Sequence, residues 1–436
     1  MHLAFCSIIV FIFVCSNQGH QTMKVAIIGA GPSGLISAKY CADAGFDYDI
    51  YEQTGAVGGT WVYTDKTDLD ENDLPVHSSM YKNLRTNLPK ELMTFGGFTY
   101  PEELKRSYLY QAEVLQYFEN FTKHFHIDEH IKFFSYVKQI ESLTNGKWLV
   151  KLLDVKSKTE TEHIYNVVMV CNGHYEKPFI PDIKGASGFE GMKLHSHAYR
   201  IAEIFTGKTV LIIGGGPSGI DISRLLSKVA LKVFLSHRNV IPIKLPNSVY
   251  LKPIVKEIFK NSVVFNDGTE ENIDVILYCT GYEYSYPFLS KNSDIEIVNG
   301  KWVRPLYKQI VNIEHPTMAF IGIPFAVAAI PVLEVQVRFF ISSLTGHFQI
   351  PSKENMLKDF QEYVTDKKSK SMYPNYMHKM GNYLEQEKYF NDLTTTANIT
   401  RVPNVVNKLY KAVKDMRNLD ACYKIVDSET FEVTFC

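Results

Sequence analysis

The feature that most constrains this fold is a strand, glycine turn and helix unit that occurs twice along the chain. Residues 24–29 (KVAIIG) and 209–214 (TVLIIG) are apolar runs that end in glycine, which is typical of buried parallel strands. Each copy predicts a βαβ unit with a nucleotide-binding turn, and the copies are too far apart for a solenoid repeat. The predicted helices and second strands are, in order, 33–44 and 47–52 in the first copy, and 218–228 and 232–236 in the second.

The second copy is bracketed by two more apolar strands, at residues 166–173 and 274–281, and a later strand at 318–322 returns to the first sheet. A chain of 436 residues also exceeds what one core usually holds. The sequence therefore predicts an α/β fold of two Rossmann-like dinucleotide-binding domains, the second inserted into the first. The predicted ranges are 1–22 for a leader, 23–176 for the first part of the outer domain, 177–282 for the inserted domain, and 283–436 for the rest of the outer domain with peripheral C-terminal helices.

The first glycine turn has the residue types that a dinucleotide site requires. Gly29 allows the tight turn, Gly31 lets the backbone approach a pyrophosphate, and Gly34 allows the helix to pack closely on the strand. Glu52 ends the next strand, where a carboxylate accepts hydrogen bonds from both ribose hydroxyls of an adenosine. An ordinary glycine-rich turn is the alternative, but strand, helix and terminal acid together favour dinucleotide binding. The predicted contacts are Gly29, Gly31, Pro32, Ser33, Gly34 and Glu52.

The second turn repeats this pattern but ends differently. Ser236 ends its second strand and Arg238 follows two residues later, where the first copy has Glu52. A carboxylate repels a 2′-phosphate, whereas a hydroxyl and a guanidinium bind it, so this end favours NADPH over NADH. In the alternative interpretation Arg238 is a solvated surface cation and the site takes either nucleotide. The predicted NADPH contacts are Gly214, Gly216, Ser218, Gly219, Ser236 and Arg238.

A glycine pair in Val57-Gly58-Gly59-Thr60-Trp61 follows Glu52 closely and favours FAD in the first site, with Gly59, Thr60 and Trp61 beside it. Together with three further segments, these residues resemble the flavin-containing monooxygenase family. The segments are Phe189-x-Gly191-x-x-x-His195-x-x-x-Tyr199, the Thr86-Asn87 segment within residues 81–93, and Cys279-Thr280-Gly281-Tyr282. The resemblance runs from about Lys24 to about Phe340.

The resemblance implies hydride transfer from NADPH to FAD, followed by O₂ addition to give a flavin C4a-hydroperoxide that oxygenates a small nucleophile such as a tertiary amine. It assigns Asn87 as the catalytic polar group beside the flavin, with Thr86 next to it. The alternative for Asn87 is a turn residue that caps backbone groups ahead of Pro89. For His195, a structural role between the domains is at least as well supported as a chemical one. For Arg338, a helix-face ion pair is favoured over a phosphate contact.

The N-terminus reads as a secretory leader. Residues 3–15 are almost wholly apolar and too few to span a bilayer, so we expect a secreted protein with no stable membrane anchor. The alternative is a segment that is not cleaved and stays as a membrane anchor. In that compartment Cys422 and Cys436 can form a bridge, and Asn120 and Asn398 lie in glycosylation sequons. Leader and missing anchor together resemble the soluble insect branch of the family, whose members N-oxygenate plant pyrrolizidine alkaloids.

The partners expected are a small amine substrate and O₂. The balance of 46 basic and 47 acidic residues disfavours nucleic acid as a partner, we expect no metal site, and a homo-oligomer is compatible with the sequence. Three other functions remain: a Baeyer–Villiger enzyme, a sulfide monooxygenase and a non-catalytic secreted binding protein. A flavin disulfide reductase is disfavoured because the chain has no C-x-x-C or C-x-x-x-x-C pair.

Overall fold

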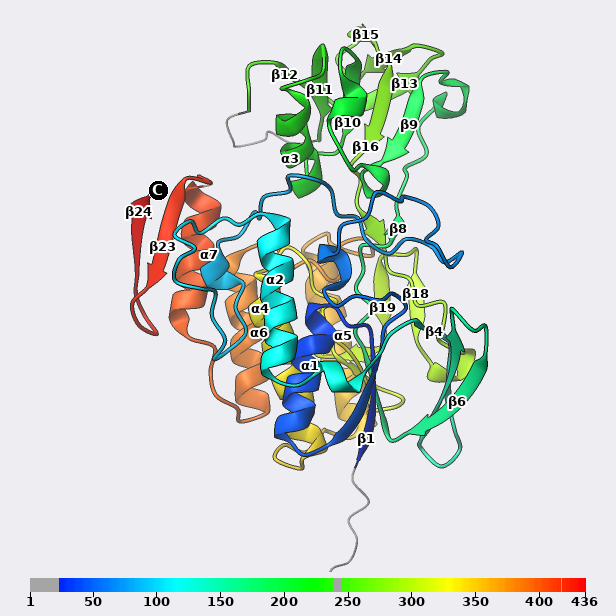
Figure 1. Cartoon of the computed structure of the whole chain (residues 1–436), viewed down its shortest axis with the longest axis vertical. Helices are drawn as coiled ribbons and strands as arrows, with labels where there is room; N and C mark the ends of the chain where they lie inside the picture. The colour runs from blue at the N-terminus through cyan, green and yellow to red at the C-terminus, as the bar shows by residue number, and fades with distance from the viewer. Residues whose placement is uncertain (1–22, 239–244, 417) are drawn as a thin grey trace, which may run out of the picture.

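The chain forms a large and a small lobe joined at a narrow waist (Figure 1). A computed structural model describes residues 23–238, 245–416 and 418–436, so the predicted leader lies outside the described residues. The large lobe is built on one sheet in which β7, β1, β2, β3 and β22 run parallel and β20 and β21 form an antiparallel edge. In spatial order its strands are β20 (Leu306–Tyr307), β21 (Val311–Asn312), β22 (Met318–Phe320), β7 (Val167–Val170), β1 (Lys24–Ile28), β2 (Asp47–Tyr51) and β3 (Ile131–Lys132).

The small lobe is built on a wholly parallel sheet whose strands all lie between residues 192 and 278. This confirms the predicted α/β fold with a second dinucleotide-binding unit inserted into the first. The two crossing segments, β8 (Lys177–Pro178) and β17 (Tyr282–Glu283), pair antiparallel at the waist. The other elements of this lobe are β12 (Val249–Lys252), β11 (Lys232–Ser236), β10 (Thr209–Ile213), β16 (Val275–Tyr278), β9 (Met192–His195), α3 (Pro217–Leu226), and the antiparallel strands β13 (Val255–Ile258), β14 (Ser262–Phe265) and β15 (Glu270–Asn272).

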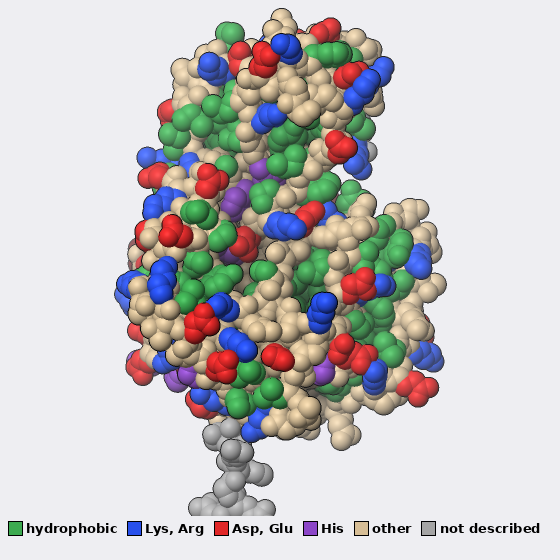
Figure 2. Space-filling view, turned by 90° about the vertical axis from the view of Figure 1, so that its right-hand side faces the viewer, with side chains coloured by type: hydrophobic (Ala, Val, Ile, Leu, Met, Phe, Trp, Pro, Cys, Tyr) green, Lys and Arg blue, Asp and Glu red, His purple; other side chains and the backbone are tan. Residues whose placement is uncertain are grey.

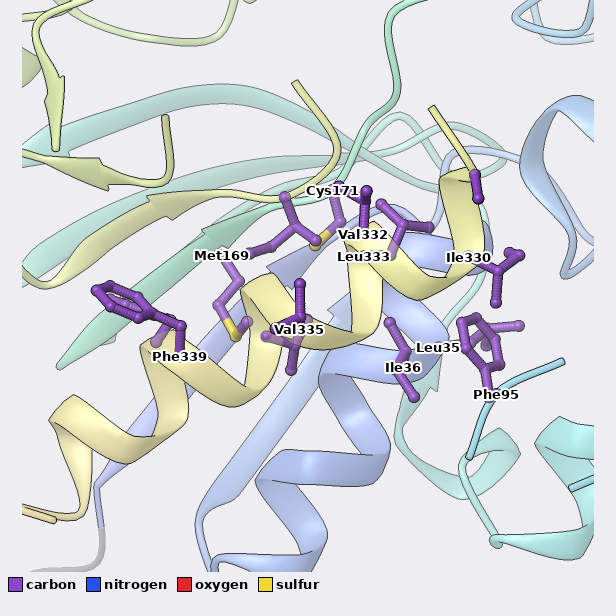
Figure 3. Close-up of a cluster of buried hydrophobic side chains, with 14 of the residues drawn as sticks. Leu35, Ile36, Phe95, Met169, Cys171, Ile330, Val332, Leu333, Val335 and Phe339 are labelled. Atoms are coloured by element: carbon purple, nitrogen blue, oxygen red, sulfur yellow. The ribbon is translucent and has the colours of Figure 1, made fainter. Parts of the chain in front are cut away.

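The core of the large lobe lies between its sheet and two helices, α1 (Pro32–Asp43) and α4 (Ala329–Leu344). Figure 3 shows apolar side chains of α4 directed at Leu35 and Ile36 of α1 and at Met169 of β7. Both helices are apolar on the face that meets the sheet, so burial of these faces drives the packing. The opposite face of the sheet is covered by an antiparallel sheet of β4 (Ser135–Ser142), β5 (Trp148–Asp154) and β6 (Glu160–Tyr165).

The predicted strands and helices are present, and most differ from the prediction only at their ends. The largest differences are at β7 and β16, which end at Val170 and Tyr278 although we expected strands through Gly173 and Gly281. Gly173 has a φ of +75°, a left-handed conformation that takes the chain out of the sheet. The glycine that closes each predicted strand therefore belongs to the turn.

The C-terminal part was predicted to be peripheral, and this is wrong. It forms α5 (Lys353–Ser369), α6 (Tyr383–Thr396) and α7 (Asn404–Met416), and the last two bury Leu393 and Leu409 completely in the main core. The strands β23 (Ala421–Ile425) and β24 (Phe431–Phe435) then form an antiparallel hairpin, which the sequence did not predict. A disulfide joins Cys422 to Cys436, with Cα atoms 6.0 Å apart. No helix of residues 23–238, 245–416 and 418–436 is both long and apolar enough to cross a bilayer.

A neutral histidine, His378, ties the C-terminal part to residues 303 and 309, which flank the edge strand β20 of the large sheet. His378 is 1% exposed, its Nε2 accepts a hydrogen bond from the Val303 N–H, and its Nδ1 lies 3.0 Å from Oε1 of Gln309. Burial lowers the pKa of His378 to about 3, and burial likewise lowers the pKa of His174 and His195 to about 4. Each ring must therefore stay neutral for the native packing to persist.

We expect the free energy of unfolding to fall as the pH decreases from about 6.5 towards 4. The folded pKa of His378 lies below its unfolded value, so its contribution is complete above the unfolded pKa and is lost as the pH falls. Over that window one such group contributes on the order of 3 kcal/mol. Urea unfolding at several pH values should give a shallower acid slope for His378→Gln than for the exposed control His347→Gln. Equal slopes would exclude His378 as a source of the acid sensitivity.

Candidate active site

The first glycine turn is closed by backbone contacts that only glycine permits. Gly29 has a φ of +104°, and a Cβ there would lie 2.8 Å from the carbonyl oxygen of Cys171. A Cβ on Gly34 would lie 1.9 Å from the carbonyl oxygen of Gly29, so helix and strand touch at this point. Gly31 is the N-cap of α1, which has no side-chain cap and no acidic residue in its first turn. The uncapped N–H groups beside Pro32 and Ser33 therefore suit a pyrophosphate.

Glu52 is held against this turn rather than left free at the strand end. It is 7% exposed, its Oε2 accepts from the Ala30 N–H at 3.0 Å, and its Oε1 accepts from the N–H and Oγ1 of Thr54 at 2.9 and 2.8 Å. These bonds orient the carboxylate, and its remaining lone pairs can accept ribose hydroxyls. The geometry fits the adenosine end of FAD.

The glycine pair after Glu52 folds back onto the first turn. Gly58 has a φ of +113° and donates its N–H to the Ala30 carbonyl oxygen at 3.0 Å. A Cβ on Gly59 would lie 3.0 Å from Cα of Gly31, so the two loops approach closely. Gly59, Thr60 and Trp61 form a short 3₁₀ turn beside the start of α1, and the Trp61 ring lies 6.4 Å from that of Phe118. The structure thus brings the predicted FAD contacts into one place.

The second turn has the same construction. Gly214 has a φ of +114°, and a Cβ on Gly219 would lie 1.9 Å from the Gly214 carbonyl oxygen. Gly216 caps an α3 that also lacks a side-chain cap and an acidic first turn, with Ser218 in that turn. A Cβ on Gly216 would meet no atom within 4 Å, which leaves room for a ligand to approach the backbone. A second pyrophosphate, that of NADPH, fits here.

The two residues predicted to hold the 2′-phosphate have different surroundings. Ser236 is 4% exposed, and its hydroxyl donates to the carbonyl oxygen of Pro253 at 2.8 Å. The hydroxyl proton of Ser236 is therefore engaged in a hydrogen bond within the protein and is not free for a phosphate. Arg238 is exposed after the end of β11, directly before residues 239–244, which lie outside the described part of the chain. Of the pair, Arg238 is the one whose side chain is exposed.

We expect Arg238→Ala to raise the KM for NADPH about tenfold or more. A charge-assisted hydrogen bond contributes ~1.5–3 kcal/mol, and its loss should leave kcat much less affected. Steady-state NADPH oxidation measures both constants, and Arg224→Ala, on the last turn of α3, is a matched control for removing a cation. A KM within a factor of two of the wild-type value would contradict the assignment of Arg238 to the 2′-phosphate of NADPH.

Thr86 and Asn87 lie on a segment that is hydrogen-bonded to Leu109 of a neighbouring segment. Thr86 is 2% exposed, its N–H donates to the Leu109 carbonyl oxygen at 2.9 Å, and its Oγ1 accepts from the Leu109 N–H at 3.0 Å. Asn87 is exposed, and among the described residues its side-chain amide has no hydrogen-bond partner. The alternative role, capping backbone ahead of Pro89, is therefore absent from this structure.

Histidines gather at the waist between the lobes, where Figure 2 shows their side chains in the crevice. His195 is 5% exposed at the end of β9; its Nδ1 accepts from the His197 N–H at 3.1 Å, and its ring lies 5.1 Å from that of Tyr282. Its Nε2 is buried without a partner among the described residues, and burial lowers its pKa to about 4. The neutral, packed ring is in keeping with the structural role. Arg338 donates to the carbonyl oxygen of Thr400, and within residues 23–238, 245–416 and 418–436 it does not form the predicted helix-face ion pair.

The sequence did not reveal two contacts that join the lobes. The Tyr81 hydroxyl donates to Oδ2 of Asp221 at 2.6 Å, linking the segment before Asn87 to α3. Arg200 is 6% exposed and donates to a set of backbone carbonyls on both sides of the waist: those of Thr64, Lys66, Ser78, His197 and Tyr199. Burial raises the pKa of the Asp221 carboxyl and lowers that of Arg200. An arginine directly after Tyr199 was the available signal for the second contact.

Comparison with known proteins agrees with this site. The family described as flavin-binding monooxygenase-like matches residues 22–243 and 239–418. The chain is 34% identical to senecionine N-oxygenase from Tyria jacobaeae over 430 residues, covering 95% of this chain and 93% of that protein. It is 35% identical to flavin-containing monooxygenase FMO GS-OX3 from Arabidopsis thaliana over 394 residues, covering 86% and 84%.

Solved structures give the same result. The S-allyl-L-cysteine S-oxygenase of Allium sativum has a TM-score of 0.85 at 33% identity, covering 91% of this chain and 93% of that one. A structure of OTEMO in complex with FAD and NADP shares the fold at 15% identity, with a TM-score of 0.58 and coverage of 79% and 90%. Two uncapped glycine turns, the buried acid at the end of β2 and these similarities agree with one another. The chain therefore belongs to the flavin-binding monooxygenase-like family and is an FAD-dependent monooxygenase that uses NADPH.

Proposed function

We propose that this monooxygenase N-oxygenates a nucleophilic tertiary amine, with a plant pyrrolizidine alkaloid as the substrate, and so detoxifies it. The observation that carries the proposal is the 34% identity to an insect senecionine N-oxygenase over nearly the full length of both proteins. The plant relatives named GS-OX match a smaller share of this chain, between 82% and 86%.

The overall reaction balances as amine, O₂, NADPH and H⁺ giving N-oxide, NADP⁺ and water. When bound, FAD supplies the redox chemistry: it takes two electrons from NADPH and activates O₂. The chain's own residues would bind and orient the cofactors: the Gly31 and Gly216 turns would hold the two pyrophosphates, and Glu52 would hold the ribose of FAD. The Asn87 amide has no partner among the described residues, so it can donate a hydrogen bond to the reacting oxygen and keep it from leaving as H₂O₂.

A second candidate is oxygenation of a thioether. The S-allyl-L-cysteine S-oxygenase has nearly the same identity, 33%, and the same fold at a TM-score of 0.85. A sulfur lone pair attacks the same kind of electrophilic oxygen, so the described residues suit both nucleophiles. The substrate class must therefore be tested directly.

The test is NADPH oxidation against a panel of a pyrrolizidine alkaloid, simple tertiary amines, thioethers and ketones, with mass spectrometry of the products. We expect an N-oxide, and the highest kcat/KM for the alkaloid. A sulfoxide as the preferred product would replace the proposal by the second candidate, and an ester from a ketone would indicate Baeyer–Villiger chemistry. A protein that binds FAD but oxidises none of these would contradict the proposal altogether.

We also propose that the protein is secreted. Residues 1–22 have the composition of a secretory leader, and the Cys422–Cys436 disulfide suits an oxidising compartment. Asn120 and Asn398 are both exposed and therefore accessible to glycosylation. Expression in insect cells, followed by N-terminal sequencing of the protein in the medium, tests this. Retention in the cells with residues 1–22 intact would contradict it.

A further inference from the structure

We propose that the C-terminal hairpin, residues 421–435, is a positioning element that fixes the segment bearing Asn87. The inference rests on the role proposed for Asn87. It assigns a function to a part of the chain beyond residue 418, where the match to the family ends. Figure 1 shows β23 and α7 beside the chain that leads into α2 (Gln111–His124). The two regions are more than 300 positions apart in sequence, as the hydrogen bond between Arg85 and Leu419 shows, at a separation of 334.

The Asn87 segment, residues 84–92, has no regular structure of its own beyond a short 3₁₀ turn at Lys90–Leu92. It is held by the strip 104–111, which runs beside it. The Gln111 N–H donates to the Leu84 carbonyl oxygen at 3.1 Å, and the Lys90 N–H donates to that of Ser107 at 2.7 Å. The position of Asn87 therefore depends on what holds residues 104–111 in place.

The turn that leads into the hairpin, residues 419–420, holds the segment on the N-terminal side of Asn87 through Arg85. NH2 of Arg85 donates to the carbonyl oxygen of Leu419 at 2.9 Å, and its Nε donates to that of Tyr108 at 3.3 Å. NH1 lies 3.8 Å from Oδ1 of Asp420. One guanidinium thus joins the Asn87 segment, the neighbouring strip and the turn directly before the hairpin.

A second connection lies on the C-terminal side of Asn87. The Tyr423 N–H donates to Oγ of Ser107 at 2.7 Å, and that hydroxyl donates to Oε1 of Glu91 at 3.0 Å. The rings of Tyr423 and Tyr108 meet edge to face at 6.4 Å. Asn87 therefore lies between two anchor points, Arg85 and Glu91, that lead to the same hairpin.

One strand of the hairpin is buried against the strip 104–111, and the other faces solvent. Ala421, Cys422 and Tyr423 of β23 are at most 6% exposed, whereas β24 faces solvent and Phe435 is 70% exposed. The Cys422–Cys436 disulfide closes the open end of the hairpin, next to the strip: Sγ of Cys422 lies 3.4 Å from the Lys105 carbonyl oxygen. Without the bridge, a two-stranded ribbon with one exposed strand is marginal in water.

The experiment uses three independent variants of the FAD-loaded enzyme: Cys422→Ser with Cys436→Ser, Arg85→Met, and Ser107→Ala. We expect each to keep its FAD content and its KM for NADPH but to release several-fold more H₂O₂ per NADPH oxidised. Hydrogen–deuterium exchange of peptides covering residues 84–92 should become several-fold faster, in the FAD-free protein as well. Arg85→Lys should restore part of the coupling that Arg85→Met loses.

The matched control is Glu429→Gln, which removes an exposed ion pair with Lys408 at the far turn of the same hairpin and should change neither readout. Unchanged exchange and coupling in all three variants, with Asn87→Ser uncoupled, would overturn the inference and leave the role of Asn87 intact. Full coupling in Asn87→Ser itself would overturn both.

Discussion

Asn87→Ser should retain FAD and consume NADPH while releasing most of the oxygen as H₂O₂ in place of oxygenated product. Asn87 is exposed, and its amide makes no hydrogen bond within the described residues. Removing the amide therefore takes no hydrogen bond away from another described group, and the fold should be unaffected. A serine hydroxyl is shorter and does not reach the same point. Loss of one oriented donor of this type costs about 10²–10³ in rate, equivalent to ~2.7–4 kcal/mol.

The measurement is the ratio of H₂O₂ to product per NADPH, together with the visible spectrum of the bound flavin. Asn145→Ser, in the turn between β4 and β5, is the control, since this exposed asparagine only accepts from the Lys147 N–H at 3.1 Å. Unchanged coupling in Asn87→Ser would remove the residue from the catalytic site. Loss of FAD in that variant would instead indicate a binding role.

The second large effect is a contrast between two glycines of the NADPH turn. Gly219→Ala places a Cβ 1.9 Å from the carbonyl oxygen of Gly214, so α3 must move away from β10. Overpacking of this kind costs about 1–3 kcal/mol or more, and we expect a lower melting temperature together with loss of NADPH binding.

Gly216→Ala should behave in the opposite way. Its φ is −78°, and a Cβ there meets no atom within 4 Å, so the fold should keep its melting temperature. The methyl group stands where the pyrophosphate must approach the backbone, and we expect the KM for NADPH to rise at least about tenfold, or 1.4 kcal/mol. Differential scanning calorimetry and steady-state kinetics separate the two variants. Wild-type NADPH kinetics in Gly216→Ala would show that this turn does not hold the pyrophosphate.

Much of the fold follows from local sequence. The apolar runs at 24–29 and 209–214, with their glycine turns, predict both sheets, because a buried parallel strand and a glycine turn need only short-range patterns. Glu52 and Arg238 could also be predicted as nucleotide contacts, because each lies at or just after the end of a predicted strand. For Ser236 the sequence predicts a phosphate contact, whereas the structure uses its hydroxyl for the carbonyl of Pro253, a partner that periodicity does not reveal.

Local patterns in the sequence were enough to predict the two dinucleotide turns, since each turn depends on residues within about 30 positions of one another. The contact between the Asn87 segment and the turn before the C-terminal hairpin, and the hydrogen bond from Tyr81 to Asp221 across the waist, are visible only in the folded protein. Such contacts depend on how distant backbone segments meet after the cores have packed. A hydrogen bond between residues 334 positions apart leaves no pattern in the neighbourhood of either one.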